Sequence, residues 1–113
     1  MAIPYLQSGQ VCSVLPADVA TDTLQSLALF KDPHLEVIRM VLPAGKTIPP
    51  HHVNGPITIH CLAGEVAVKS EQQTYSLDAG DLQYFAGGVE HQLEAMQASV
   101  LLVSIVLIPS SAS

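Results

Sequence analysis

The sequence predicts an all-β protein, a small antiparallel barrel of the jelly-roll type. Three observations support this prediction: apolar runs are short, turn-forming residues interrupt them at short intervals, and no window of eleven residues keeps a helical period. The turn signals are Pro43-Ala44-Gly45, Asn54-Gly55-Pro56, Ala63-Gly64, Glu71-Gln72, Asp78-Ala79-Gly80 and Gly87-Gly88. Many short strands joined by regular turns are typical of a sandwich or a barrel.

The strands are expected in the apolar or alternating runs between these turns. They are predicted at residues 23–30, 35–42, 57–62, 66–69, 74–77, 82–85, 91–96 and 100–108. Residues 49 and 50 are both proline, which donates no ladder hydrogen bond and favours edges and bulges. The proline pair therefore favours a bend in the segment that carries His51 and His52.

The length and the charge of the chain restrict its class. At 113 residues the chain suits one domain, which we place at 23–108, with an N-terminal extension at 1–22 and a frayed tail at 109–113. The extension is expected to pack on the barrel or on a dimer partner. The formal charge is −6, and the four fixed cations, Lys31, Arg39, Lys46 and Lys69, do not cluster. A nucleic-acid partner is not expected, because no basic face is available for phosphates.

Neither the cysteines nor the chain ends indicate secretion or a membrane. Cys12 and Cys61 form no disulfide framework and match no zinc motif. The N-terminus lacks a basic region followed by an apolar stretch, and the run at 100–108 has about half the length of a membrane span. We expect a cytoplasmic protein without a membrane partner.

The last predicted strand is apolar on both faces, whereas a strand with one solvent-exposed face would alternate. It is covered either within the fold or by a second subunit. We predict a homodimer.

The spacing of glycines and histidines resembles the cupin family. Gly45 is followed after five residues by His51, and Gly64 closes this first segment; a second segment contains Gly80, Gly88 and His91. The resemblance covers about residues 35–108 and implies a double-stranded β-helix. In many cupins a divalent metal is bound by two histidines and a glutamate of the first motif and a histidine of the second.

The sequence departs from the family pattern at two of the four ligand positions. Val53 occupies the second histidine position and Ile57 the glutamate position, and Ala86 and Ala95 replace the proline and the asparagine of the second motif. A transition metal needs three or more donors to compete with water, and hydrocarbon side chains supply none. The resemblance thus implies a depleted site for Fe, Mn, Ni or Zn on His51 and His91, which His52 joins only if the segment bends.

Strand alternation predicts which side chains face the barrel interior. In the family register Ile57, Ile59 and Cys61 point inward, whereas His60 points outward. The predicted pocket comprises His51, His91, Val53, Ile57, Ile59, Cys61, Gln83, Phe85, Leu93 and Met40. Two interpretations stay open: these residues form a small-molecule pocket, or they simply fill the barrel. Cys61 is expected to be a packed, unreactive thiol.

Three functions are compatible with this sequence. The first is binding of a small, largely apolar ligand between His51 and His91. The second is a metal-dependent oxygenase or isomerase that uses His51, His91 and a third donor such as His52. The third is a non-catalytic dimerising module. We rank them in this order, because the missing glutamate disfavours a metal enzyme and the fold alone does not determine a reaction.

Overall fold

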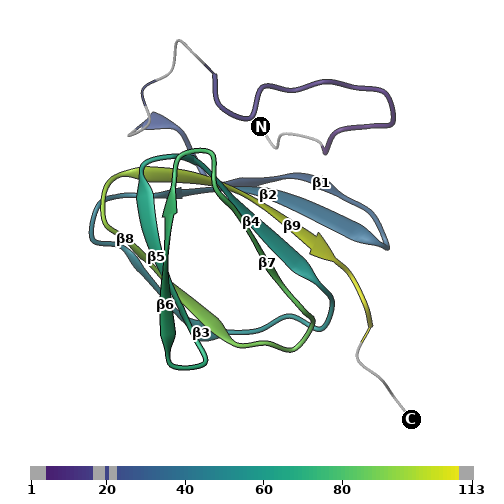
Figure 1. The fold of residues 1–113 in the computed structure, drawn as a ribbon. Coiled ribbons are helices and arrows are strands. Elements are labelled where there is room, and N and C mark those ends of the chain that lie inside the picture. Colours follow the sequence, from purple (N-terminus) through teal and green to yellow (C-terminus); the bar gives the residue numbers. More distant parts are fainter. Residues whose placement is uncertain (1–4, 17–19, 21–22, 110–113) are drawn as a thin grey trace.

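The computed structural model describes residues 5–16, 20 and 23–109, and within these ranges it contains nine strands in two antiparallel sheets (Figure 1). The strands are β1 (Leu27–Lys31), β2 (Leu35–Leu42), β3 (Thr47–His51), β4 (Ile57–Ala63), β5 (Glu65–Ser70), β6 (Gln73–Asp78), β7 (Leu82–Phe85), β8 (His91–Ala95) and β9 (Ser99–Val106). One sheet has the order β1-β2-β9-β4-β7 and the other β3-β8-β5-β6. The predicted all-β fold is confirmed. In the described ranges no helix has the length and apolar character to cross a membrane.

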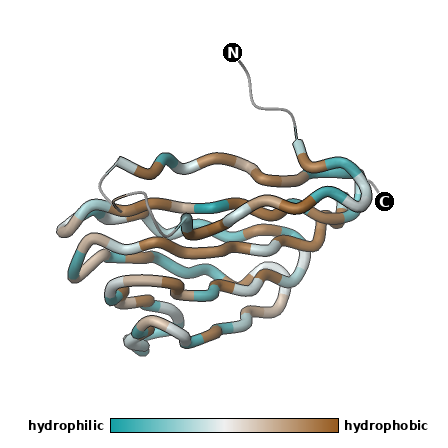
Figure 2. The backbone as a smooth tube through the Cα atoms, turned by 90° about the horizontal axis from the view of Figure 1, so that it is seen from above, coloured by the Kyte–Doolittle hydropathy of each residue, from teal (hydrophilic) through white to brown (hydrophobic). Residues whose placement is uncertain are grey.

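The core lies between the two sheets and follows from strand alternation. In β4, Ile57, Ile59 and Cys61 are buried, while the intervening side chains are only partly covered. Their partners in β9 along the register are Ile105, Val103 and Leu101. Figure 2 shows hydrophobic stretches along neighbouring strands, with hydrophilic residues at many of the turns. The predicted inward and outward faces of β4 are confirmed.

Strand β3 was not predicted, because its proline pair disfavours a regular ladder. It lies at an edge of the four-stranded sheet and pairs with β8 alone. The register shifts between Ile48 and His51, the interval that contains Pro49 and Pro50. An edge strand with a bulge tolerates proline, since the missing N–H faces away from the ladder.

The N-terminal segment packs on the outer face of the five-stranded sheet (Figure 1). The amide of Leu6 donates to the carbonyl of Leu29 at 2.9 Å. Arg39, only 8% exposed, donates from Nη1 to the carbonyl of Val14 and from Nε to the carbonyl of Gln25. Residues 5–16 therefore cover part of the face opposite the core. The remainder of the predicted extension at 1–4, 17–19 and 21–22, and residues 110–113 of the predicted tail, lie outside the described residues.

The central position of β9 accounts for part of its apolar character on both faces. β9 pairs with β2 on one side and β4 on the other. Leu101 and Val103 are buried in the core, while Leu102 on the opposite face borders a hollow that Leu6 and Val14 also line. Burial within the chain thus explains much of the pattern that suggested a second subunit.

Candidate functional site

The structure brings His51 and His91 into contact inside the barrel. They are register partners in β3 and β8, and their ring centroids are 4.5 Å apart at an interplanar angle of 61°. Ile48 and His51 are three residues apart, so a regular strand would place them on opposite faces. The register shift at the two prolines lets Ile48 pack against the core while His51 meets His91. The proline pair is therefore the sequence signal that positions this histidine.

Both imidazoles are oriented by hydrogen bonds to backbone carbonyls. Nδ1 of His51 lies 3.2 Å from the carbonyl oxygen of Pro49, and Nδ1 of His91 lies 3.2 Å from that of Val89. A carbonyl oxygen can only accept, so each Nδ1 carries the hydrogen. In the neutral ring Nε2 then holds a lone pair, which can accept a hydrogen bond or bind a metal ion.

The environment of His91 favours the neutral ring. His91 is 2% exposed, and Phe85 stacks on it with a centroid distance of 5.0 Å and an interplanar angle of 3°. Burial lowers the pKa of His91 below its ordinary value, and the nearby His51 and His52 lower it further. The hydrogen bond to Val89 opposes this shift but does not reverse it. His91 is therefore an uncharged group near neutral pH.

The donor set does not fit a resident transition metal. Among the described residues, no group of three or more His, Cys, Asp or Glu side chains could hold a metal ion. His52 follows β3, and its side chain is exposed. Two imidazoles leave a metal site open and weak, because the remaining positions are filled only by water.

The other residues of the predicted pocket largely fill the centre of the barrel. Ile57, Ile59, Cys61, Phe85 and Leu93 are at most 8% exposed and belong to one core cluster, and Met40 and Val53 pack against it. Gln83 is partly buried, and its Oε1 lacks a hydrogen-bond partner in the described part of the chain. His60 lies on the outer face, where its register partners are Leu82 and Leu102. With the two imidazole rings in contact, a ligand must approach them from one side rather than lie between them.

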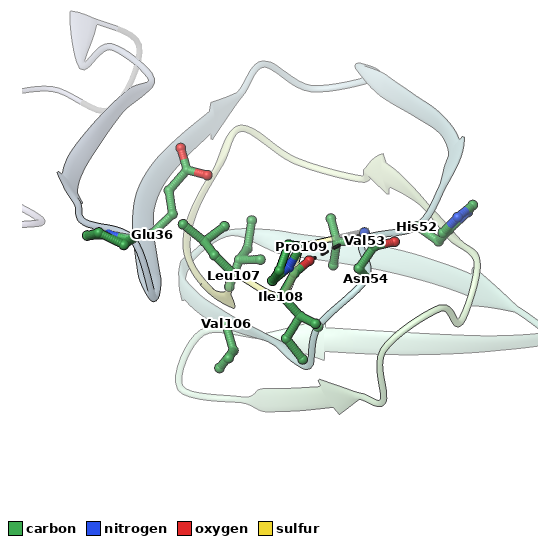
Figure 3. Close-up of a pocket in the computed structure, with 11 residues that line it drawn as sticks. Glu36, His52, Val53, Asn54, Val106, Leu107, Ile108 and Pro109 are labelled. Carbon is green, nitrogen blue, oxygen red and sulfur yellow. Dashed lines mark hydrogen bonds between the residues drawn. The ribbon is translucent and has the colours of Figure 1, made fainter. Parts of the chain in front are cut away.

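A pocket of about 500 Å³ lies beside this core, where β9 ends and the segment between β3 and β4 begins (Figure 3). We call it the mouth pocket. Its volume is within the range of small-molecule sites. It is lined by Pro33, Glu36, His52, Val53, Asn54, Gly55, Ile105, Val106, Leu107, Ile108 and Pro109. Val53 and His52 were sequence candidates, whereas the others were not.

Among the residues that line the mouth pocket, Glu36 is the one that strand alternation could have predicted. It precedes Ile38 and Met40 by two and four residues in β2, and both of these side chains pack against the core. The segment at 107–109 follows β9, and no local sequence signal indicates that it lines a pocket.

Comparisons with known proteins agree with the class that this architecture defines, a small double-stranded β-helix. A family model described as a cupin domain matches residues 38–106. The chain belongs to the cupin family. Comparison with curated proteins yields no significant match.

Many solved structures share the fold at low sequence identity. A conserved protein of unknown function from Streptococcus pyogenes is similar with 22% identity and a TM-score of 0.73, over 96% of this chain and 99% of that one. A cupin superfamily protein from Desulfitobacterium hafniense gives 13% identity and a TM-score of 0.76, over 92% and 95%. A mutant of salicylate 1,2-dioxygenase from Pseudoaminobacter salicylatoxidans gives 23% identity and a TM-score of 0.62, over 65% of this chain and 21% of that one. At these identities the likeness concerns the fold.

Proposed function

We propose that this cupin binds a small, largely apolar molecule whose body occupies the mouth pocket and whose polar end reaches the imidazole of His51. The contact between His51 and His91 carries the proposal, because two oriented rings present acceptor nitrogens inside an otherwise apolar barrel. His52 and Val53, which line the pocket, follow His51 directly in the chain.

The mouth pocket is connected to the histidine pair by packed side chains. Ile105 lines the pocket and is the register partner of Ile57 in β4. Ile57 is in turn the partner of Phe85 in β7, and Phe85 stacks on His91. Ile57 is thus the one register position between Ile105, which lines the pocket, and Phe85, which stacks on His91.

A metal-dependent oxygenase or isomerase is less well supported. It would use the same two acceptor nitrogens, and a distantly similar structure is that of a dioxygenase. The third donor that a retained metal needs is absent from the described residues. Metal analysis of protein purified without chelator separates the two functions: we expect less than about 0.1 metal ion per chain, whereas a substantially filled site would favour the enzyme.

The binding proposal is tested with para-ethylphenol, which combines an apolar body with one hydroxyl donor. We expect the probe to shift the methyl signals of Ile105 and the ring signals of His51 in NMR titrations. His51→Gln should weaken binding, and His34→Gln, which alters an exposed histidine, should not. If the probe leaves both sets of signals unchanged, or if the two variants behave alike, the proposal is wrong.

We further propose that the chain forms a homodimer through an outer patch made of Thr58, His60, Leu82, Tyr84 and Leu102. These residues share the outer face of β4, β7 and β9, and Leu82 and Tyr84 are 66% and 63% exposed. The patch contains no acidic residue, so two copies of charge −6 can approach through it with little repulsion. Exposed apolar side chains that share one face are typical of association surfaces.

Sedimentation equilibrium tests the dimer. Tyr84→Glu should yield monomers, because it buries an unpaired charge in the interface. Met96→Glu, a matched change at an exposed turn outside the patch, should leave the dimer intact. A wild-type monomer across the accessible concentration range would contradict the proposal.

The cytoplasmic location and the absence of nucleic-acid and membrane partners stay predictions from composition.

A further inference from the structure

We infer that the mouth pocket selects ligands with a cationic end, and that Glu36 binds this end. The inference rests on the proposed function and adds a substrate class, apolar amines, to it. Glu36 is the one acidic residue among the side chains that line the pocket. Figure 3 shows Glu36 and His52 at opposite sides of the pocket, with Leu107, Ile108 and Pro109 between them.

Glu36 is held at the pocket by its place in β2. It is partly buried, and its backbone pairs with Ile105, which also lines the pocket. Within the described residues its side chain makes no hydrogen bond or ion pair. Lys31 is its register partner in β1, but the two charges do not form a salt bridge. A carboxylate that is partly desolvated and unpaired gains most from a ligand that brings both positive charge and N–H donors.

The apolar walls of the pocket are fixed by backbone hydrogen bonds. The amide of Leu107 donates to the carbonyl of His34 at 2.8 Å, and the amide of Val106 donates to that of Pro56 at 3.0 Å. These bonds attach the end of β9 and the residue after it to the loops on either side. The pocket thus has a defined shape and combines hydrocarbon walls with one negative group.

The net charge of the chain also favours a cationic ligand. At a formal charge of −6 the protein attracts cations and repels carboxylates, and a half-enclosed apolar pocket weakens the screening of Glu36. A ligand with an ammonium group at Glu36 and a hydroxyl directed at the imidazole of His51 satisfies both polar ends of the site.

Three para-substituted phenols that differ only in the end group test this inference. Tyramine carries an ammonium, tyrosol a neutral hydroxyl and phloretate a carboxylate. In NMR titrations followed at the methyl groups of Ile105 and Leu107, tyramine should bind at least about tenfold more tightly than tyrosol, and phloretate most weakly. This comparison uses the unmodified protein and does not depend on a variant that folds.

Two charge variants and a matched control test whether the preference for an ammonium group depends on Glu36. Glu36→Gln should weaken tyramine binding at least about tenfold and leave tyrosol almost unchanged. Lys31→Met should strengthen tyramine binding by about twofold or more, because it removes the nearest register cation. Glu94→Gln removes the same charge from an exposed position on β8 and should have little effect.

The outcomes distinguish this inference from the proposed function. Equal affinities for tyramine and tyrosol, or a Glu36→Gln variant indistinguishable from Glu94→Gln, would overturn the role of Glu36 while leaving a ligand site in place. If none of the three phenols shifts the Ile105 and Leu107 methyl signals, both proposals are wrong.

Discussion

His51 and His91 contact each other edge to face, with ring centroids 4.5 Å apart, although they are forty positions apart in the chain. Phe85 stacks on His91, so this imidazole contacts both a second imidazole and an apolar aromatic ring. Such an environment disfavours a positive charge on His91, and the stability of the protein should reflect this.

The stability of the protein should depend on pH through His91. Because its pKa is lowered in the folded state, the unfolded chain binds the proton more readily. The free energy of unfolding therefore has its full value above the ordinary pKa of 6.5 and decreases as the pH falls through the lower, folded-state value. Thermal denaturation should show Tm falling by several degrees on acidification from about pH 7 to about pH 5.

The variant His91→Phe serves as the comparison for this effect. It removes the titrating group while keeping an aromatic ring beside Phe85, so Tm should be much less sensitive to pH over the same interval. His34→Gln, a change at an exposed histidine, controls for the removal of an imidazole elsewhere in the chain. An identical pH profile for wild type and His91→Phe would show that another group is responsible.

Gly64 and Gly80 should respond differently to alanine, although both have positive φ, at 88° and 97°. An added Cβ at Gly64 would meet the backbone of Ala98 and the side chain of Ser99, whereas at Gly80 it would meet open space. Gly80→Ala should cost about 1–2 kcal/mol for the left-handed backbone. Gly64→Ala should cost about 1–3 kcal/mol more, because backbone cannot yield easily. Urea denaturation measures the difference, and equal losses would contradict it.

The two thiols should differ sharply in reactivity. Cys61 is fully buried, and this burial raises the pKa of its thiol, an effect that the nearby Asp81 and Asp78 reinforce. Cys12 is exposed. A thiol reagent such as Ellman's reagent should modify one cysteine per native chain, mapped to Cys12 by mass spectrometry, and both after unfolding. Rapid labelling of Cys61 in the native protein would show that the barrel opens readily.

Removing the buried polar atom of Gln83 should stabilise the protein. Its Oε1 has no partner in the described part of the structure, and a buried unpaired acceptor costs about 1–3 kcal/mol. Gln83→Met keeps the length of the side chain, so the free energy of unfolding should rise by about 1 kcal/mol, as measured in urea. Gln97→Met, at an exposed turn, should be close to neutral. A loss of stability in Gln83→Met alone would indicate that a bound water or ligand satisfies the amide.

Sequence reasoning predicted the parts of this fold that depend on local patterns. The range predicted for the strand at 35–42 is that of β2, and alternation correctly oriented Ile57, Ile59 and Cys61. It did not predict β3, because the prolines that disfavour a strand are tolerated at a sheet edge, and edge position is a property of the whole topology.

The candidate site could be predicted only in part. The family spacing placed His51 opposite His91, and the register confirms this pairing. Whether the centre of the barrel is open or filled depends on how the side chains of the two sheets pack together. The alternation of apolar and polar residues along a strand does not predict this packing. Glu36 and Ile105 come from different strands and line the mouth pocket with the segment after β9, a meeting that local sequence cannot reveal.

The protonation of the two imidazoles tests the account most directly. Long-range proton–nitrogen NMR spectra at about pH 8, where histidines are ordinarily neutral, distinguish ring nitrogens that carry a hydrogen from those that do not. We expect both His51 and His91 to carry the hydrogen on Nδ1 and to present an unprotonated Nε2. Hydrogen on Nε2 of either ring would contradict the account, because no acceptor pair would then face the ligand.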